Sequence, residues 1–351
     1  MVSLDSVKTT WKLDRSRVFD SVRALGEQIG AVWADTANFD LHGLPKKIDN
    51  AVVFGMGGSA LGAHIVQSLY GTELKVPFFF VSSYEIPGFV GPNTLAVFSS
   101  YSGSTEEVLR TLEECKKRNA YCLGIGVGGE LGKKLGSRFF KLNPKHNPSG
   151  HPRLGSGYMT FGLMGLLHKT GLLNLTTQEI SKTAVFAKQE CKKLAKDGAD
   201  NLYKKIAKNL HKFNIVVAAS EFLAGNAHLF SNQLNESSKN FSNYFLLPEL
   251  NHHLMEGLKY PESNKNNLKF ILLESDLYSP RVKLRYKITK EVLNKNGIKF
   301  ESLKFAAKSK LLQVVEMMVL GGFTSFYLAM LNKIDPGDVK WVDYFKTKMS
   351  K

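Results

Sequence analysis

The 351-residue chain is poor in several features that would assign it to a common class of protein. It has only three cysteines, Cys115, Cys122 and Cys191, and their spacing matches no metal site, so we expect reduced thiols that pack in the interior. No apolar run approaches the ~20 residues that cross a bilayer, and the first residues lack the apolar centre of a signal peptide. We therefore expect a cytoplasmic protein with no membrane partner.

Acidic residues are also few, because 31 Asp and Glu face 47 Lys and Arg, which gives a net charge of +16. Such a charge raises the question of a nucleic-acid partner. The lysines, however, occur in short pairs such as Lys116–Lys117 and Lys204–Lys205, and no long basic block carries interleaved aromatic residues. We expect a solvated basic surface and no nucleic-acid partner, with a modest attraction for an anionic substrate.

The length and the pattern of apolar residues predict two domains. A single core rarely grows beyond ~250 to 300 residues. Strand-like apolar segments alternate with helical patterns, and near-continuous apolar strands indicate a parallel sheet that is covered on both faces. Because this pattern occurs twice, we predict an α/β fold of two doubly wound, flavodoxin-like domains. The predicted divisions are an N-terminal helical segment (1–40), a first α/β domain (41–175), a helical crossing (176–210), a second α/β domain (211–335) and a C-terminal helical tail (336–351).

The predicted elements follow from the same pattern. Strands are expected at 51–54, 78–82, 94–98, 121–125 and 139–142 in the first domain and at 213–219, 244–247, 270–273 and 300–303 in the second. Val18, Val22, Leu25 and Ile29 stand at helical spacing and predict one N-terminal helix. A further helix is expected from Glu249.

The stretch from Thr94 to Leu109 is the most informative part of the chain. A buried strand, Leu95–Phe98, runs into the hydroxyl-rich segment Ser99–Thr105, and a helix begins at Glu106. A strand that ends in small hydroxyl residues just before a helix leaves free backbone N–H groups and the positive end of the helix dipole beside several Ser and Thr oxygens. The sequence predicts a site for a phosphate ester that needs no lysine.

A second loop of this kind, Gly55–Ser59, follows the strand at Val52–Phe54. It is a loose match to a dinucleotide fingerprint, but the third glycine is missing and the acidic Glu85 comes later than that fingerprint requires. The lysine of a nucleotide P-loop is also missing. Ligands of parallel sheets bind beyond the carboxyl ends of the strands, where both loops lie. A phosphorylated small molecule is therefore favoured over a dinucleotide or ATP.

Candidate catalytic groups occur in the second half, at Glu236 and at the adjacent His252 and His253. A carboxylate and an imidazole are what proton abstraction next to a carbonyl and the opening of a sugar ring would need. Taken alone, a glutamate on a helix is more often a solvated surface residue, and such histidines are more often helix-start or packed residues than catalysts. No other His, Cys or carboxylate cluster stands at ligand spacing, so we expect no metal.

Four motifs, taken in order, resemble the family of bifunctional phosphoglucose/phosphomannose isomerases, which are built of two sugar isomerase domains. These motifs are Gly55–Met56–Gly57–Gly58–Ser59, Ser100–Tyr101–Ser102–Gly103–Ser104–Thr105–Glu106–Glu107, Asn232–Gln233–Leu234–Asn235–Glu236 and Pro248–Glu249–Leu250–Asn251–His252. The resemblance spans nearly the whole chain and includes Pro152–Arg153 and the ending from Tyr327 to Lys346. Each motif alone is weak, but the ordered combination is specific.

The resemblance implies a cofactor-independent aldose–ketose isomerase. Its substrate would be a sugar 6-phosphate, and glucose 6-phosphate and mannose 6-phosphate would interconvert with fructose 6-phosphate through a cis-enediol. The positions that match the family's substrate-binding residues are Gly58, Ser59, Ser100, Ser102 and Thr105.

The resemblance also implies the roles of four further residues. Glu236 matches the base that moves a proton between C2 and C1, and Arg153 looks like the cation that stabilises the enediolate. His252 matches the histidine that helps to open the ring and that is presented from the partner subunit. The implied partner is thus a second copy, in a homodimer with a shared active site. Lys346 resembles the tail lysine that reaches the site.

Three departures from the family pattern affect substrate choice more than reaction type. Ser104 stands where the family usually has Asn, and His253 follows His252 where relatives often have Asn, so either histidine could face the sugar. The strand before Glu221 lacks the usual glycines. The alternatives are a non-catalytic sugar-phosphate-binding or regulatory protein and an isomerase of another sugar phosphate.

Overall fold

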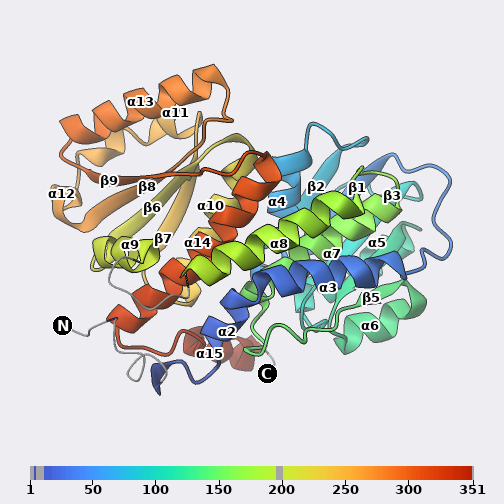
Figure 1. Cartoon of the computed structure of the whole chain (residues 1–351). Coiled ribbons are helices and arrows are strands. Elements are labelled where there is room, and N and C mark those ends of the chain that lie inside the picture. The colour runs from blue at the N-terminus through green and yellow to red at the C-terminus, as the bar shows by residue number, and fades with distance from the viewer. Residues whose placement is uncertain (1–3, 5–11, 195–200, 350–351) are drawn as a thin grey trace.

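The computed structural model describes residues 4, 12–194 and 201–349, and it contains two parallel sheets (Figure 1). The first sheet has the order β2-β1-β3-β4-β5 and the second the order β7-β6-β8-β9. The strands of the first sheet are β1 (Asn50–Gly55), β2 (Phe78–Val81), β3 (Thr94–Ser99), β4 (Tyr121–Gly126) and β5 (Phe139–Lys141). Those of the second are β6 (Asn214–Ala219), β7 (Ser242–Leu246), β8 (Leu268–Glu274) and β9 (Lys299–Lys304).

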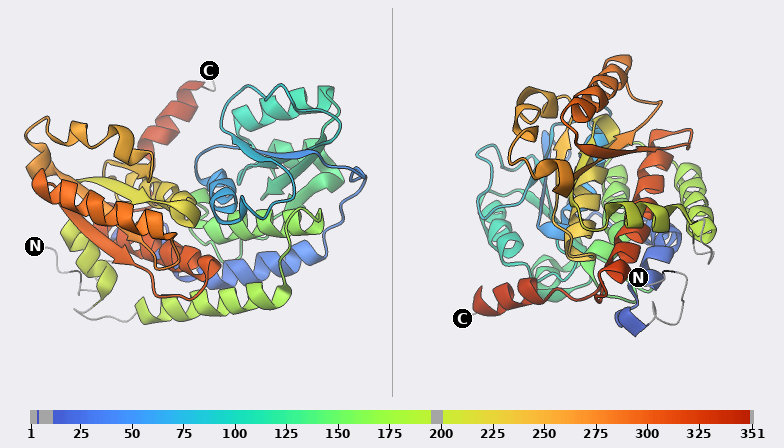
Figure 2. Two further views of the ribbon diagram at one scale, coloured as in Figure 1. Left: turned by 90° about the horizontal axis from the view of Figure 1, so that it is seen from above. Right: turned by 90° about the vertical axis from the view of Figure 1, so that its left-hand side faces the viewer.

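Helices cover both sheets and fill the space between them (Figures 1 and 2). In the first half they are α2 (Val18–Arg23), α3 (Leu25–Ala37), α4 (Leu61–Tyr70), α5 (Glu106–Lys117), α6 (Gly129–Leu135), α7 (Ser156–Lys169) and α8 (Thr177–Leu194). In the second half they are α9 (Leu202–Leu210), α10 (Ala224–Glu236), α11 (Leu250–His253), α12 (Asn264–Asn267), α13 (Pro280–Lys295), α14 (Lys310–Leu331) and α15 (Lys340–Met349). These elements confirm the predicted fold class of two α/β units with parallel sheets.

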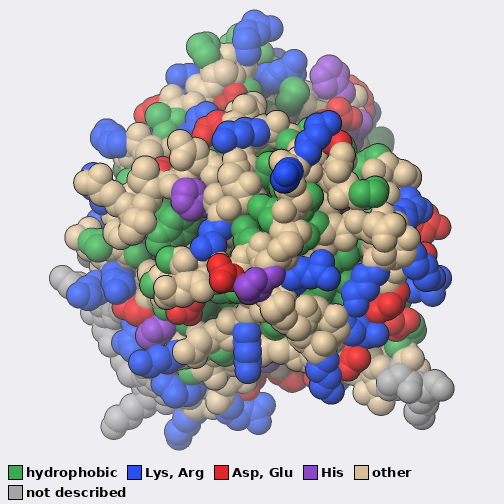
Figure 3. Space-filling model, turned by 90° about the vertical axis from the view of Figure 1, so that its right-hand side faces the viewer, with side chains coloured by type: hydrophobic (Ala, Val, Ile, Leu, Met, Phe, Trp, Pro, Cys, Tyr) green, Lys and Arg blue, Asp and Glu red, His purple; other side chains and the backbone are tan. Residues whose placement is uncertain are grey.

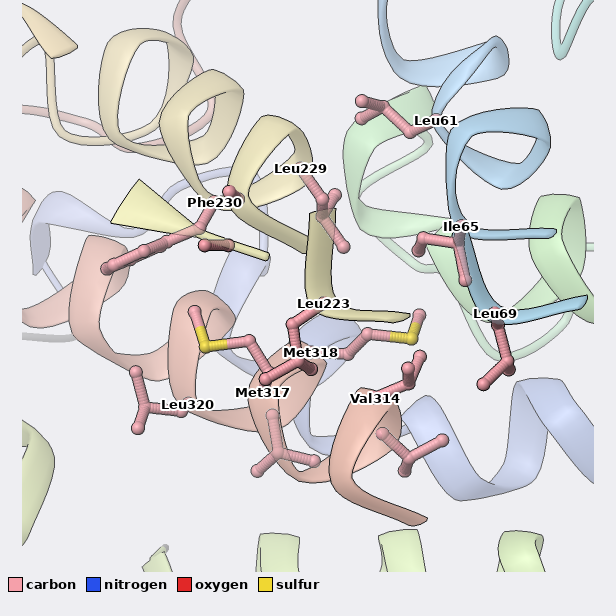
Figure 4. Packing of buried hydrophobic residues seen from close by; sticks show 14 of the residues in the cluster. Leu61, Ile65, Leu69, Leu223, Leu229, Phe230, Val314, Met317, Met318 and Leu320 are labelled. Atoms are coloured by element: carbon pink, nitrogen blue, oxygen red, sulfur yellow. The ribbon is translucent and has the colours of Figure 1, made fainter. Parts of the chain in front are cut away.

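The two halves share one hydrophobic core, in which α4 of the first half packs against α10 and α14 of the second. Figure 4 shows side chains from the three helices meeting in this core, among them Leu61, Ile65, Leu69, Leu229, Phe230, Val314, Met317 and Met318. The central strands β3 and β4 are buried along their whole length, because helices cover both faces. Sites at the carboxyl ends of the two sheets are thereby held in a fixed mutual arrangement. The division of the chain at residues 41, 176, 211 and 336 stays a prediction.

The single N-terminal helix predicted from Val18 to Ile29 is wrong. The chain forms two helices, α2 and α3, which are separated at Ala24, where the backbone leaves helical geometry (φ −87°, ψ 14°). Helix α2 packs on α14, whereas α3 packs on α7 and α8. Both helices bury the same apolar stripe, so the pattern of apolar residues shows no break. The helix expected from Glu249 is likewise only the single turn α11.

Helix α14 differs from the expectation that no apolar segment approaches the length that crosses a membrane. Within the described residues, this 22-residue helix is long and apolar enough to cross a membrane by length and composition, although no such run was expected. The structure buries 89% of its most apolar window inside the protein, and a core helix needs the same composition. We therefore describe α14 as the central core helix.

Two expectations about side chains agree with the structure. The three cysteines are buried and unbridged, and burial raises the pKa of the Cys115 and Cys191 thiols to about 12. On the face shown in Figure 3, Lys and Arg side chains are dispersed among Asp, Glu and uncharged groups.

Candidate active site

The hydroxyl-rich loop after β3 folds into a compact cradle before α5. The Ser100 and Thr105 hydroxyl oxygens lie 2.8 Å apart in a hydrogen bond, and the Gly103 N–H donates to Ser100 Oγ over 3.1 Å. Gly103 has a φ of +72°, and a Cβ there would overlap the Gly128 carbonyl, so only glycine fits. The loop thus depends on its glycine as much as on its hydroxyls.

The N-terminus of α5 opens onto this loop. Thr105 precedes the helix in an extended conformation (φ −72°, ψ 121°), and its side chain makes no capping hydrogen bond. Ser102 is exposed, and its Oγ accepts the Ser104 N–H over 3.3 Å. Hydroxyls beside an uncapped helix N-terminus are suited to binding an anion.

The glycine loop after β1 is fastened to the cradle. Ser59 Oγ accepts the Tyr101 N–H over 2.9 Å, and the Ser99 hydroxyl donates to the Ser59 carbonyl over 2.7 Å. A Cβ on Gly58 would lie 2.8 Å from Arg153 N, so the absence of a side chain lets the loop contact the backbone of Arg153. Gly58 therefore connects the cradle to the predicted cation.

Arg153 is the most deeply buried charged residue of the site, with 2% of its surface exposed. Its Nε donates to Ser237 Oγ over 3.0 Å, and its Nη1 lies 3.3 Å from Glu236 Oε2. Its Nη2 donates to the Pro336 carbonyl over 2.7 Å. Burial lowers the pKa of Arg153, and the nearby carboxylates of Glu236 and Asp335 oppose that shift. An arginine keeps its charge under such conditions, and its planar fork is held in one orientation.

Glu236 is the last residue of α10, and 32% of its side chain is exposed. The carboxylate therefore pairs with a buried guanidinium on one side and faces solvent on the other. Such a group can exchange a proton with a bound ligand while the arginine holds its position. The pair also joins the two halves, because Arg153 precedes α7 of the first half and Glu236 ends a helix of the second.

Two predicted site residues lie apart from this group. His252 is exposed on α11, and among the described residues no hydrogen bond or ion pair links its side chain to Arg153, Glu236 or the cradle. Lys346 is exposed on α15, a helix that buries none of its residues and extends from the body of the protein (Figure 2). The chain by itself therefore brings together the cradle, Arg153 and Glu236, but neither His252 nor Lys346.

Several contributing residues were missed by sequence reasoning. Ser237 is fully buried and orients Arg153, yet only its place next to Glu236 gave a signal. Asn147, in the Pro- and Asn-rich segment 143–153, donates to the Tyr101 hydroxyl over 2.8 Å and to the His151 carbonyl over 3.0 Å. Composition predicts an irregular segment there, but it cannot show that Asn147 is buried against the cradle.

The described residues contain no group of three or more His, Cys, Asp or Glu side chains that could hold a metal ion. The polar groups of the site are hydroxyls, backbone N–H groups, one guanidinium and one carboxylate. This set is suited to binding a phosphate ester and moving a proton beside it.

At the corresponding edge of the second sheet, a carboxylate of the protein itself occupies the N-terminus of the next helix. After β6 the chain turns at Glu221, whose side chain accepts the Ser279 N–H at the start of α13 (3.2 Å to Oε1, 3.4 Å to Oε2). The buried Tyr278 hydroxyl accepts the Ser220 N–H over 3.4 Å and donates to the Leu273 carbonyl over 3.1 Å. The protein's own side chains thus occupy this place.

Comparisons with known proteins give a consistent result. The model of the bacterial phospho-glucose isomerase C-terminal SIS domain matches residues 199–349. The bifunctional phosphoglucose/phosphomannose isomerase of Aquifex aeolicus is 30% identical over 325 residues, which are 91% of this chain and 94% of the relative. The protein of that name from Caldicellulosiruptor bescii is 28% identical over 337 residues, or 95% and 99% of the two chains.

Solved structures share the fold. A hypothetical protein from Thermus thermophilus superposes with a TM-score of 0.73 at 18% identity, covering 98% of this chain and 92% of its own. The C-terminal domain of glucosamine-fructose-6-phosphate aminotransferase from Francisella tularensis gives 0.69 at 15% identity, with 90% and 96% covered.

Proposed function

The chain belongs to the family of bifunctional phosphoglucose/phosphomannose isomerases, and we propose that it is a cofactor-independent aldose–ketose isomerase. Its substrates are glucose 6-phosphate and mannose 6-phosphate on one side and fructose 6-phosphate on the other. The observation that carries the proposal is the ion pair between buried Arg153 and partly exposed Glu236, next to a hydroxyl cradle. A protein that only binds sugar phosphates would need the cradle but not this pair.

The cradle holds the 6-phosphate. The hydroxyls of Ser59, Ser100, Ser102 and Thr105, with the backbone N–H groups of the α5 N-terminus, donate to the phosphate oxygens. Gly58 keeps the loop close enough for the sugar to extend toward Arg153. Binding at the phosphate end thereby orients C1 and C2, which supplies much of the rate gain expected from positioning.

Glu236 transfers the proton. From the ketose, its carboxylate removes a proton from C1, the carbonyl oxygen at C2 takes up a proton, and a cis-enediol results. Glu236 then returns a proton to C2 while the C1 hydroxyl loses one, so the aldose forms with no net change in protons. Arg153 stabilises the negative oxygen that develops in the enediolate, as a preorganised cation in a poorly solvated place does.

A homodimer completes the site in this proposal, with His252 of one subunit opening the sugar ring bound by the other. Helix α11 presents both histidines to solvent, but the ring of His253 packs 5.8 Å from that of Phe245, which favours His252 as the one that meets the sugar. Helix α15 supports a second subunit as well, because its aromatic residues are unusually exposed: Trp341 73%, Tyr344 57% and Phe345 62%. Closure of α15 onto the dimer would bring Lys346 to the phosphosugar.

The activity is tested with purified protein, fructose 6-phosphate and EDTA, and with separate identification of glucose 6-phosphate and mannose 6-phosphate. We expect both products. Glu236→Gln should lower kcat by about 100-fold or more while sugar-phosphate binding persists, because a positioned base contributes that much. Glu256→Gln, an exposed glutamate of the second half, is the matched control and should remain active.

Two results would contradict the proposal. Full activity of Glu236→Gln would exclude Glu236 as the base. A folded wild-type protein that binds fructose 6-phosphate but releases no aldose would indicate a binding protein instead.

A further inference from the structure

The backbone after α10 adopts an unusual conformation at Lys239. Its φ is +55°, in the left-handed region, although helices that end this way usually place glycine or asparagine there. A lysine with a Cβ is disfavoured at such a position. Lys212 and Lys333 have the same left-handed backbone, with φ of +74° and +59°, so the case for Lys239 depends on the contacts of its side chain.

The Lys239 ammonium lies against four backbone carbonyls. Two belong to the end of α10, Glu236 at 2.8 Å and Ser237 at 3.5 Å, and two belong to a distant segment, Asp335 at 3.1 Å and Pro336 at 3.5 Å. The last carbonyls of a helix lack partners within the helix, and a cation there is favourable. Lys239 therefore ties the helix end that carries Glu236 to the segment at 335–336.

Residues 335–337, which we call the strap, are also held by Arg153. Its Nη2 donates to the Pro336 carbonyl over 2.7 Å and lies 3.4 Å from the Gly337 carbonyl. Asp335 pairs with Arg15 at 3.0 Å and accepts the Gly337 N–H over 2.8 Å. The Arg153 guanidinium thus depends on a strap that Lys239 fastens from the other side.

The Arg153 guanidinium and the Lys239 ammonium both approach the Pro336 carbonyl, so two positive charges lie close together and repel each other. Burial and the Arg153 charge lower the pKa of Lys239 to about 8, whereas Asp335, Asp338 and Glu236 oppose that shift. The residue retains exposed surface, so the four carbonyls rather than enclosure hold the ammonium. Lys239, three positions after the proposed base Glu236, therefore combines a left-handed backbone with the nearby positive charge of Arg153.

We propose that Lys239 is a positioning residue of the isomerase, which fixes the Glu236 carboxylate relative to Arg153 by joining the end of α10 to the strap. This inference rests on the proposed function. Lys239 does not contact the substrate in this role. Displacement of a reacting group by about 1 Å can lower a rate by about 100-fold, so a loosened helix end should be visible in kcat.

Three variants separate positioning from a local structural role. Lys239→Gly removes the ammonium and relieves the left-handed strain, so the fold should tolerate it. Lys239→Arg keeps a cation. Lys212→Gly is the matched control, because Lys212 is an exposed lysine with a φ of +74° just beyond α9. The measurements are kcat and KM for fructose 6-phosphate, together with the unfolding midpoint.

We expect Lys239→Gly to lose about tenfold or more in kcat while KM changes by less than about threefold, because the phosphate cradle lies on the other sheet. Its unfolding midpoint should not fall, Lys239→Arg should keep at least about a third of kcat, and Lys212→Gly should equal the wild type.

Full kcat in Lys239→Gly, or an equal loss in Lys239→Arg, would overturn the inference. If the wild type isomerises fructose 6-phosphate and Glu236→Gln does not, such a result overturns only the role of Lys239. A folded wild type without isomerase activity would overturn the proposed function and this inference together.

Discussion

The carboxyl ends of the two sheets start from the same backbone plan. After β1 the chain stays extended at Met56 and turns at Gly57 with a φ of +49°. After β6 it stays extended at Ser220 and turns at Glu221, where φ is +44°. A short 3-10 turn and a core helix follow in both halves. The second half therefore keeps a glycine-like turn although a glutamate occupies it.

The two edges differ in what lies at the start of the next helix. In the first sheet the α5 N-terminus faces hydroxyls and has no side-chain cap. In the second, the Glu221 carboxylate accepts the N–H at the start of α13 and Tyr278 fills the space beside it. A carboxylate at a helix N-terminus satisfies the same groups that would bind a phosphate. One fold has thus produced a helix N-terminus that is open beside hydroxyls and another that a carboxylate closes.

The largest effect is expected from Gly103→Ala in the open edge. A Cβ there would overlap the Gly128 carbonyl and would also strain a left-handed backbone, so we expect a loss of about 3 kcal/mol or more in unfolding free energy. Gly171→Ala is the control, because Gly171 follows the end of α7 with a φ of +75° and open space around it, and the change should cost only about 1 kcal/mol. Equal denaturant midpoints for the two variants would show that the cradle does not need a bare backbone.

Paired serine substitutions compare function at the two edges. Ser100 and Ser275 each follow a central strand, are buried and bond within their own loop. Ser100→Ala should raise KM for fructose 6-phosphate by about 10- to 100-fold, because a hydrogen bond to a charged group is lost. Ser275→Ala should cost about 1 kcal/mol of stability and leave KM unchanged. If Ser100→Ala and Ser275→Ala had a similar KM for fructose 6-phosphate, the 6-phosphate would not be bound at Ser100.

The interface between the two halves should weaken in acid. His64 of α4 and His228 of α10 lie 4.3 Å apart between ring centroids, and burial lowers the pKa of His64 to about 4 and also lowers that of His228. The unfolded chain binds these protons near pH 6.5, so stability should be complete above that value and fall as the pH drops toward 4, by on the order of 1–3 kcal/mol.

Thermal unfolding between pH 7 and 4.5 tests this interface. His64→Gln should flatten the decline, whereas His42→Gln, at an exposed histidine, should not. An identical decline in wild type and His64→Gln would assign the acid sensitivity to other groups.

The smallest loss of stability is expected in the second sheet, where Glu221 occupies the α13 N-terminus. Glu221→Gln keeps the shape of the cap but removes its charge from the α13 N-terminus, which should cost about 0.5–1 kcal/mol with no change in KM. The denaturant midpoint measures the first quantity and steady-state kinetics the second. A changed KM would mean that this edge also takes part in substrate binding.

Local sequence patterns predict the structure at the carboxyl end of the first sheet better than at that of the second. Continuous apolar residues such as those of β3, followed by hydroxyls, were sufficient to predict a strand, a hydroxyl-rich loop and a helix, because neighbours in sequence make the contacts. That the loop binds an anion stays a prediction. The Glu221 cap depends on β6 and β8 being adjacent, which only the assembled sheet determines. Arg153 and Glu236 are 83 residues apart, so family resemblance could suggest a role for each of them, but neither it nor their spacing predicted the ion pair between them. The break at Ala24 was not predicted, because the apolar residues of α2 and α3 form one continuous stripe.

Proton transfer by Glu236 at the open edge is tested most directly by isomerisation in D₂O. Wild-type protein converting fructose 6-phosphate should yield glucose 6-phosphate with deuterium at C2, because a carboxylate base exchanges its proton with solvent before returning it. Glu236→Gln should yield neither product nor label within the same time. A C2 position that stays free of deuterium even after prolonged incubation with the active enzyme, or undiminished labelling by Glu236→Gln, would contradict an enediol route through this carboxylate.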